Sequence, residues 1–311
     1  MVNKIDIKST HVAVIMGGLS AEREVSLSSG KSCSSALKDT GFQVSQIDVD
    51  RSIVSTLQKL NPDVVLNVLH GSFGEDGLIQ SILEFLEIPY THSGVLASAL
   101  SMDKMRAKQI VKSCGVPVCP SIVVNRFAMD YQHPMSPPYV IKPLKGGSSL
   151  GIMVIKPGQS VPLDILQSLS WNYGDQLLIE QYIDGIELSC GVMGDTPLAV
   201  TEIIVPKSDF YSYELKYLSS NYTHVMPAKI PLDIYKEVQR NAVLAHHAIG
   251  CRGISRSDFL FDPISRKIFW LEINVQPGMT PVSIFPEMAM HAGYSFQELL
   301  LWMVEDASCL R

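Results

Sequence analysis

Cysteine is scarce in this sequence, and its cysteines follow no recognisable spacing. They form no CxxC pair and match neither a zinc site nor a disulfide framework. Among 311 residues there are only six, at Cys33, Cys114, Cys119, Cys190, Cys251 and Cys309. We therefore expect reduced, buried thiols of the kind found in cytosolic proteins.

Long apolar runs, a secretory leader and a basic surface are also missing. No run approaches the roughly 20 apolar residues that cross a bilayer, and the polar N-terminal residues lack the three-part pattern of a signal peptide. The formal net charge is -6, with both signs interspersed, so no basic face suited to a phosphate backbone is visible. These absences predict a cytoplasmic location and argue against membrane and nucleic-acid partners.

What the sequence does have is enough hydrophobic residues, 46% of 311, to fill two or three cores. In the first third, β-branched runs alternate with helical patterns: HVAVIMGG, a helix toward Gly41, QVSQIDVD, a polar helix and DVVLNVLHG. This βαβαβ order is typical of a parallel sheet. A helix is expected over about 76–87, and another should begin after Ser101, a suitable N-cap, and stop at Gly115 and Pro117.

The rest of the chain predicts mixed α+β structure. The middle third has strand-like YVIKP, IMVIKP, QLLIEQYI and IELSCGVMG, and the last third has LAVTEIIV, a helix ending near Gly250, a hairpin RSDFLFD/KIFWLEIN and a C-terminal helix. Residues 206–231 form an irregular segment longer than most connections. Its aromatic residues and prolines favour a lid over a linker.

The hairpin suggests a metal site from strand geometry alone. Strand periodicity puts Glu272 and Asn274 on one face, and a turn at PISR places the partner of Glu272 near Asp258. Facing carboxylates destabilise a sheet unless something neutralises them. A divalent cation such as Mg²⁺, bound by oxygen ligands beside substrate phosphates, would do so. A solvated polar face on an edge hairpin is an equally good interpretation of the spacing.

Several loops carry weaker signals. KGGSSLG follows a strand ending at Lys142 and offers free backbone N–H groups and the hydroxyls of Ser148 and Ser149, although an ordinary tight turn explains it as well and it is not a Walker motif. GGLSAEREVS and His70 lie where ligands collect in open parallel sheets. Glu22 and Glu24 there also suit a helix dipole. Gly278 and Arg256 could donate to a developing oxyanion, or be a turn glycine and a surface arginine.

Taken in order, these segments resemble the D-alanine:D-alanine ligases, a branch of the ATP-grasp superfamily. The matching stretches are GGLSAEREVSLSSG, LHGSFGEDG, SGVLASALSMDK, VIKPLKGGSSLG, LIEQYIDGIE, YELKY, GCRGISRSDFLFD and LEINVQPGMTPVS. The resemblance implies an α/β and α+β protein, an ATP-grasp fold with an N-terminal Rossmann-like parallel-sheet domain. The implied units are 1–101, a central ATP-grasp domain at 102–187, and a C-terminal domain at 188–311 carrying the lid and the metal hairpin.

The resemblance also assigns a nucleotide site. Lys104 and Lys142 match lysines that contact the ATP phosphates, with KGGSSLG, including Ser149, as the flap above them. The family's adenine-binding linker matches Glu180, Gln181 and Ile183, and its ribose ligand matches Glu187. Asp258, Glu272 and Asn274 match the ligands of the metal, Mg²⁺ or Mn²⁺, with two ions implied.

For the amino-acid substrate, the resemblance implies that ATP phosphorylates one D-alanine and that the amine of a second attacks the acyl phosphate, giving D-alanyl-D-alanine for peptidoglycan. Glu22 would hold the first ammonium beside His70, and Arg256 with the Gly278 amide would stabilise the tetrahedral oxyanion. Lys216 and Ser283 would bind the second carboxylate, and Tyr217 would close the site toward Glu22 and Ser148. Closure would protect the acyl phosphate from water.

Three alternatives remain beside this interpretation. A relative could make D-alanyl-D-lactate or another dipeptide, although Tyr217 within YELKY favours D-alanine as the second substrate. A dinucleotide oxidoreductase is disfavoured because the first turn reads GGLSAE and not GxGxxG. A non-catalytic nucleotide-binding module would not need every metal ligand and both lysines.

One residue departs from the family pattern. Gly146 replaces an acidic residue that is common in the flap, which puts a salt-bridge latch there in doubt. The resemblance also implies a homodimer.

Overall fold

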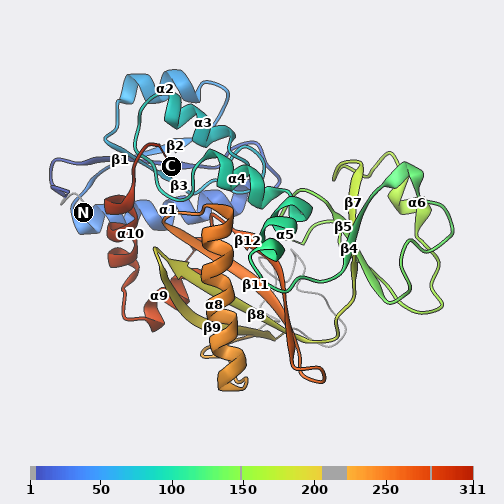
Figure 1. Ribbon diagram of the computed structural model, residues 1–311. Helices are drawn as coiled ribbons and strands as arrows, with labels where there is room; N and C mark the ends of the chain where they lie inside the picture. Colours follow the sequence, from blue (N-terminus) through green and yellow to red (C-terminus); the bar gives the residue numbers. More distant parts are fainter. Residues whose placement is uncertain (1–4, 148, 205–222, 281, 311) are drawn as a thin grey trace.

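The computed structural model describes residues 5–147, 149–204, 223–280 and 282–310, which form three β-sheets (Figure 1). The first is a parallel sheet of order β2-β1-β3, made of β1 (His11–Met16), β2 (Gln43–Asp48) and β3 (Val64–Asn67). The crossovers are α1 (Arg23–Thr40) and α2 (Ile53–Leu60), and α3 (Leu78–Phe85) follows β3. Gly41 ends α1 with a left-handed φ of 107°, and its N–H returns to carbonyls of the last turn. The predicted βαβαβ unit is confirmed.

The second sheet is antiparallel, with order β4-β7-β5-β6, and it forms a lobe of its own. We use "lobe" for residues 121–181. Its elements are β4 (Ser121–Asn125), the 3-10 turn η1 (Arg126–Ala128), β5 (Tyr139–Pro143), β6 (Met153–Ile155), α6 (Leu163–Leu166) and β7 (Gln176–Gln181). Buried Tyr139, Ile141, Leu166 and Leu177 belong to a core made only of lobe residues.

The third sheet has five strands in the order β10-β9-β8-β11-β12, and all neighbours are antiparallel. Its strands are β8 (Ile186–Met193), β9 (Thr196–Ile204), β10 (Thr223–Val225), β11 (Ile254–Asp262) and β12 (Lys267–Asn274). One face packs on α4 (Val95–Met102), α5 (Lys104–Ser113) and α8 (Leu232–Ile249). Trp270 and Phe259 are fully buried in that layer.

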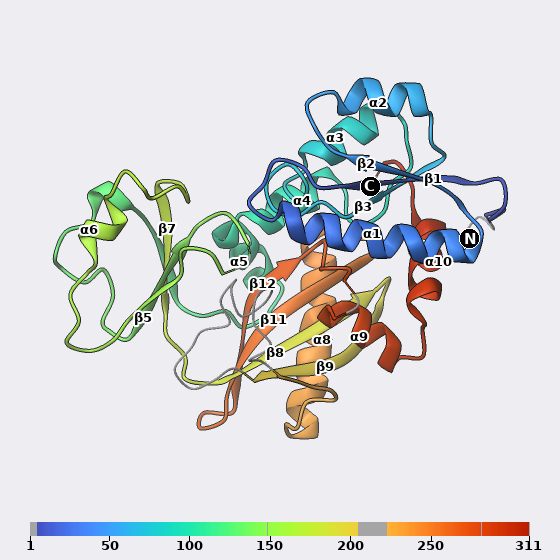
Figure 2. The ribbon, with the colours of Figure 1, turned by 180° about the vertical axis from the view of Figure 1, so that it is seen from behind.

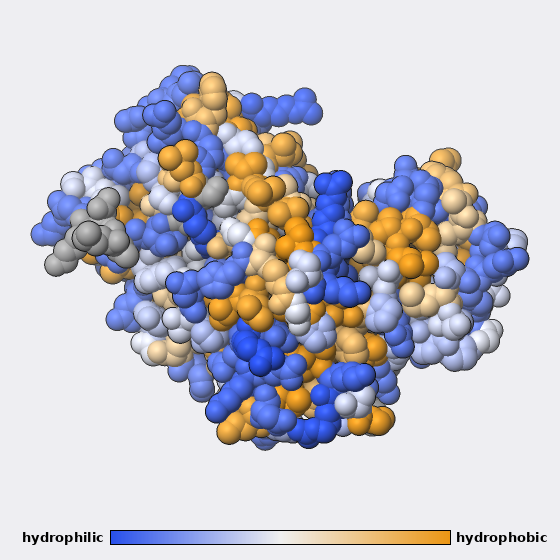
Figure 3. All heavy atoms as spheres, in the orientation of Figure 1, coloured by the Kyte–Doolittle hydropathy of each residue, from blue (hydrophilic) through white to orange (hydrophobic). Residues whose placement is uncertain are grey.

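The last two helices, α9 (Ile284–His291) and α10 (Phe296–Asp306), join the first and third sheets through one shared core. Val14 and Leu37 from the N-terminal part pack in the same cluster as Phe285 and Leu300. We call the two sheets with their helices the body. The lobe stands to one side of the body from either direction (Figure 2) and in the space-filling view (Figure 3). The body is therefore one packed unit, whereas the lobe has a separate core.

One local prediction was wrong, and another was incomplete. Ser101 is not an N-cap, because it lies inside α4, where its hydroxyl donates to the Ser98 carbonyl. The chain breaks at Asp103 instead, whose side chain accepts from the Arg106 N–H at the start of α5. The single C-terminal helix is two helices, because a capping box of Ser295 and Glu298 starts α10 afresh.

The predicted domain boundaries do not all match the packing. The boundary between the central domain and the C-terminal domain, placed between residues 187 and 188, falls inside β8. α5, assigned to the central unit, packs against α8 and β12 of the body. Most of the irregular segment 206–231, including the predicted lid residues, lies outside the described residues. Among the helices of the described ranges, none combines the length and apolar character of a membrane span.

Candidate active site

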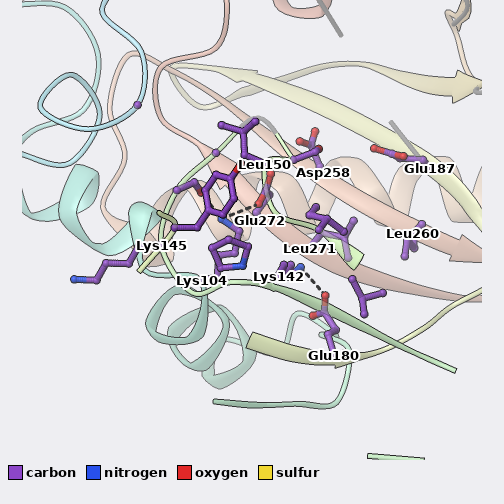
Figure 4. Close-up of a pocket in the computed structure, with 18 of the residues that line it drawn as sticks. Lys104, Lys142, Lys145, Leu150, Glu180, Glu187, Asp258, Leu260, Leu271 and Glu272 are labelled. Atoms are coloured by element: carbon purple, nitrogen blue, oxygen red, sulfur yellow. Dashed lines mark hydrogen bonds and ion pairs between the residues drawn. The ribbon is translucent and has the colours of Figure 1, made fainter. Parts of the chain in front are cut away.

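A cavity of about 820 Å³ lies between the lobe and the body. Figure 4 shows acidic side chains from the five-stranded sheet, with Lys104 and Lys142, around this space. The predicted site residues that line it are Glu22, Lys104, Lys142, Ser149, Glu180, Gln181, Ile183, Glu187, Asp258 and Glu272. Ser148, Lys216 and Tyr217 lie outside the described residues. His70, Arg256, Asn274, Gly278 and Ser283 do not line it. His70 precedes the lining residue Gly71, and Arg256 and Asn274 donate to the lining residue Asp258.

A β-bulge brings the two acidic residues of the hairpin into the cavity together. Asp258 pairs with Glu272, as predicted, but Phe259 pairs with Trp270, so Leu271 is an extra residue in β12. Ile268 and Trp270 point into the helix-covered core, and simple alternation would send Glu272 there too. The extra residue reverses the phase, and both Leu271 and Glu272 line the cavity.

The Asp258 carboxylate is held in a dense set of hydrogen bonds. It accepts from Arg256 Nε at 2.9 Å and Nη2 at 2.8 Å, from Ser189 Oγ at 2.6 Å and from Asn274 Nδ2 at 3.1 Å. Arg256 and Asn274 therefore lie directly behind a cavity-lining residue. Because paired donors fix Asp258, its charge is offered to the cavity in one orientation.

Glu272 faces a lysine across the cavity. Lys104 Nζ lies 3.5 Å from Glu272 Oε2, and the same Nζ donates to the Gly146 carbonyl in the flap. Gly146 has a φ of 114°, a conformation that side chains rarely adopt, so an acidic residue there would strain this turn. Lys104 thus connects the metal hairpin to the flap.

The oxygen ligands suit a hard divalent cation. Asp258 of β11 and Glu272 of β12 oppose one another, and Asn274 is two residues after Glu272 in β12. Two carboxylates and an amide oxygen, with nearby lysines for phosphates, fit Mg²⁺ or Mn²⁺. No group of three or more His, Cys, Asp or Glu side chains with metal-binding geometry occurs among the residues that the structure describes. Substrate phosphates would have to complete the coordination.

Lys142, which is predicted to contact phosphates, is part of a buried charge triad. Glu180 Oε2 lies 2.6 Å from Lys142 Nζ, and Glu180 Oε1 lies 2.5 Å from Lys108 Nζ. Burial alone raises the pKa of Glu180, but the two lysines outweigh it and lower that pKa. Burial lowers the pKa of Lys142 as well, but Glu180 and Glu272 outweigh it and raise it. Lys142 therefore remains a cation at the wall of the cavity.

Lys108 is a site residue that sequence reasoning missed. It is 1% exposed, donates to the Trp270 carbonyl at 3.2 Å and lies over the Trp270 ring. Burial lowers its pKa although Glu180 acts against this. Its position four residues after Lys104, on the same face of one helix, was the available signal.

At the other end of the cavity, Glu22 lies against the loop that follows β3. A Cβ atom built on Gly71 would be 2.6 Å from Glu22 Oε2, so only glycine allows this approach. His70 Nδ1 lies 3.0 Å from Glu75 Oε1. Burial lowers the pKa of His70, but Glu75 and then Glu22 outweigh it and raise that pKa. Glu75 was also missed, although it stands in the quoted HGSFGEDG stretch.

Gly278 and Ser283 lie close together just before α9. A Cβ atom on Gly278 would be 3.0 Å from Ser283 Oγ, and Ser283 Oγ accepts from the Thr280 N–H at 3.1 Å. Ser283 immediately precedes α9. The small residue at Gly278 keeps its backbone open to an incoming group.

Known proteins resemble this chain along nearly its whole length. The family models "D-ala D-ala ligase C-terminus" and "D-ala D-ala ligase N-terminus" match residues 110–305 and 50–93. D-alanine--D-alanine ligase B of Mesorhizobium japonicum is 57% identical over 308 residues, 98% of this chain and 100% of the relative. D-alanine--D-alanine ligase B of Brucella suis is 57% identical over 304 residues, 97% of this chain and 99% of the relative.

Two solved structures share the fold. The D-alanine--D-alanine ligase of Bacillus anthracis complexed with ATP has a TM-score of 0.81 at 25% identity, covering 96% of this chain and 97% of its own. The VanG D-Ala:D-Ser ligase of Enterococcus faecalis has a TM-score of 0.77 at 30% identity, covering 95% and 98%. The ATP-grasp fold predicted from the motifs is confirmed. From its sequence and its fold alike, this chain belongs to the D-alanine–D-alanine ligase family.

Proposed function

We propose that this protein is an ATP-dependent ligase that joins two D-alanines into D-alanyl-D-alanine, with release of ADP and phosphate, for peptidoglycan synthesis. The observation that carries the proposal is the bulged hairpin, which sets Asp258 opposite Glu272 in one cavity with Lys104 and Lys142. The B. anthracis relative was solved with ATP, so ATP is the nucleotide for which we propose this cavity. The lobe and body would hold the nucleotide between them.

In the proposed reaction, a carboxylate oxygen of the first D-alanine bonds to the γ-phosphorus as the β–γ bridge breaks. Lys104 and Lys142 offset the phosphate charge, and Asp258, Glu272 and Asn274 would hold Mg²⁺ or Mn²⁺, with two ions proposed. The metal supplies charge neutralisation for the transferred phosphoryl group. Glu22 would hold the first ammonium group, next to His70 and Glu75.

The ammonium group of the second D-alanine first gives one proton to solvent, and its neutral amine then attacks the acyl carbon. The new nitrogen–carbon bond forms a tetrahedral centre, which collapses as phosphate leaves, and the nitrogen gives a second proton to solvent as the amide forms. Arg256 and the Gly278 N–H would stabilise the oxyanion, and Ser283 with Lys216 would bind the second carboxylate. Tyr217 and Ser148 would close the site. Gln181, Ile183 and Glu187 would bind adenosine, with Ser149 in the flap.

The fold division at 1–101, 102–187 and 188–311, a cytoplasmic location and a homodimer remain part of this proposal. The separate core of residues 121–181 supports a central unit, although β8 crosses the limit between 187 and 188. Light scattering on the purified chain would test the homodimer directly.

The decisive experiment measures ADP release and product mass with ATP, Mg²⁺ and D-alanine, beside L-alanine, D-serine and D-lactate as alternatives. We expect ADP and D-alanyl-D-alanine in equal amounts. Asp258→Asn should lose about 100-fold or more in kcat, because a fixed charge at the reacting phosphate is removed. Asp262→Asn is the matched control, since Asp262 ends the same strand in the exposed hairpin turn.

Formation of D-alanyl-D-serine or D-alanyl-D-lactate in preference to the dipeptide would keep the ATP chemistry but replace the second substrate. Absence of ADP release with every acceptor would overturn the proposal.

A further inference from the structure

Two buried amide side chains connect the first and third sheets directly behind the amino-acid end of the cavity. Asn67, the last residue of β3, is 0% exposed, and Gln276, two residues after β12, is 3% exposed. Asn67 Nδ2 donates to Gln276 Oε1 at 2.8 Å, across 209 positions in sequence. We call these two residues the amide bridge.

The amide bridge also fixes the loop that follows β3. Asn67 Oδ1 accepts from the Leu69 N–H at 3.1 Å, and Asn67 Nδ2 donates to the Gly74 carbonyl at 3.1 Å. Gln276 Nε2 donates to the Leu69 carbonyl. The backbone of Leu69 is thus held on both sides, immediately before His70. A change in either amide would leave buried polar groups without partners.

Each residue of the amide bridge is close in sequence to a proposed substrate-binding group. His70 and Glu75 belong to the loop that Asn67 holds, and Gly278 is two residues after Gln276. The loop after β3 supplies the groups for one side of the D-alanine site, and the segment after β12 supplies Gly278 for the other. The hydrogen bond between Asn67 and Gln276 sets the separation of these two segments.

Apolar packing does not explain why amides occupy this place. The body already shares a core in which Met279, next to Gly278, packs with Cys33 of α1. A core can hold two units together, but it does not specify the spacing of two loops as directional hydrogen bonds do. Neither Asn67 nor Gln276 lines the cavity, and the side-chain amides of both are hydrogen-bonded within the protein.

We propose that Asn67 and Gln276 are positioning residues that set the spacing between the His70 loop and the Gly278 turn, and so the affinity for D-alanine. This role rests on the proposed ligase function. Because the nucleotide end of the cavity is built from other residues, the amide bridge should act on D-alanine and leave ATP binding unchanged.

The test is a double-mutant cycle with Asn67→Ala, Gln276→Ala and the double variant, measuring KM for D-alanine, KM for ATP and kcat. Each single variant should raise KM for D-alanine about tenfold, with KM for ATP within about twofold. The KM for D-alanine of the double variant should be no higher than that of the more impaired single variant, because both changes break one connection. Ser255→Ala is the control, since it breaks a buried hydrogen bond to His246, 2.7 Å long, away from the cavity.

Lower melting temperatures with an unchanged KM for D-alanine would reduce the amide bridge to a structural feature and overturn the proposal. So would equal increases in both KM values, or independent effects that multiply in the double variant. A wild-type chain that makes no dipeptide would instead overturn the proposed function.

Hydrogen exchange gives a readout that needs no activity. Residues 69–76 should exchange faster in Gln276→Ala than in Ser255→Ala, and equal exchange in the two would also overturn the positioning role.

Discussion

The two ends of the cavity are built by different means. At the nucleotide end, the wall belongs partly to the lobe and is organised by buried charges, with Glu180 between Lys108 and Lys142. At the amino-acid end, the groups belong to the body, share one hydrophobic core and are spaced by neutral amides. Under the proposed function, spacing is fixed where the two D-alanines would meet, and charge is arranged where the phosphates would bind.

Substitutions in the two hydrophobic cores test whether the lobe and the body unfold separately. Of the predicted effects on stability, these should be the largest. Leu37→Ala in the shared core and Leu166→Ala in the lobe core each remove a side chain that is 0% exposed. Each should cost about 3 to 5 kcal/mol. Native-state hydrogen exchange should show loss of protection around both β1 and α10 for Leu37→Ala, but only within residues 121–181 for Leu166→Ala.

An exposed leucine provides the control for this pair. Leu232→Ala, at a position 68% exposed, should change neither pattern. Faster exchange in β1 caused by Leu166→Ala would mean that the lobe and the body are one cooperative unit.

The charged end of the cavity is tested by Lys108→Met, with an expected loss of about 3 kcal/mol in unfolding free energy, because a buried ion pair loses one partner. Glu180 would then depend on Lys142 alone, and Lys142 would bind phosphates less well. KM for ATP should rise about tenfold while KM for D-alanine stays within about twofold. This is the opposite of the result expected for Gln276→Ala, so the two variants together sharpen the comparison.

Lys112→Met, an exposed position on the same helix, is the matched control and should leave both constants unchanged. If Lys108→Met lowered stability without changing KM for ATP, the triad would serve folding only. Denaturant unfolding and steady-state kinetics on the same preparations separate the two outcomes.

Much of the fold follows from local sequence patterns. The βαβαβ unit was predicted because its β-branched strands and the glycine after α1 act over a few residues each. α4 was missed because its own start lies at Gly94, so the chain from Val95 to Ser113 looked like one later helix with Ser101 at its head. Asp103 breaks it, and its backbone bridges to Lys145 of the flap, a contact that no local pattern records.

The site was predictable where motifs mark it and not where packing makes it. Asp258 opposite Glu272 was expected, but counting back from the turn without a bulge pairs Glu272 with Ser257. The extra residue Leu271 is visible only in the folded sheet. Lys108 lies in no quoted motif, and Gln276 stands within LEINVQPGMTPVS without a role assigned to it there. The roles of both residues depend on partners far away in the chain.

The smallest expected effect concerns His70 and Glu75 at the amino-acid end, where this pair lies close to the amide bridge. The pKa of His70 is raised above its usual 6.5 because Glu75 and Glu22 outweigh burial. Below pH 6.5 the imidazolium is present in both folded and unfolded chains, so the stabilisation that the pair gives the fold is fully present while Glu75 is ionised. Burial raises the pKa of Glu75 above its usual 4.5, so the stabilisation falls off again in acid. This stabilisation is lost as the pH rises through the higher pKa of the folded state.

Glu75→Gln should therefore destabilise the protein more at pH 6 than at pH 9, by about 1 to 2 kcal/mol, the usual strength of a hydrogen bond to a charged group. Denaturant unfolding at both pH values measures the difference, and Glu24→Gln, an exposed position on α1, should show none. An equal or larger loss at pH 9 would mean that the imidazole is neutral in the folded chain. The link between His70 and Glu75 would then be a hydrogen bond to a neutral imidazole, and Glu22 and Arg256 would remain as the ionisable groups of the amino-acid end.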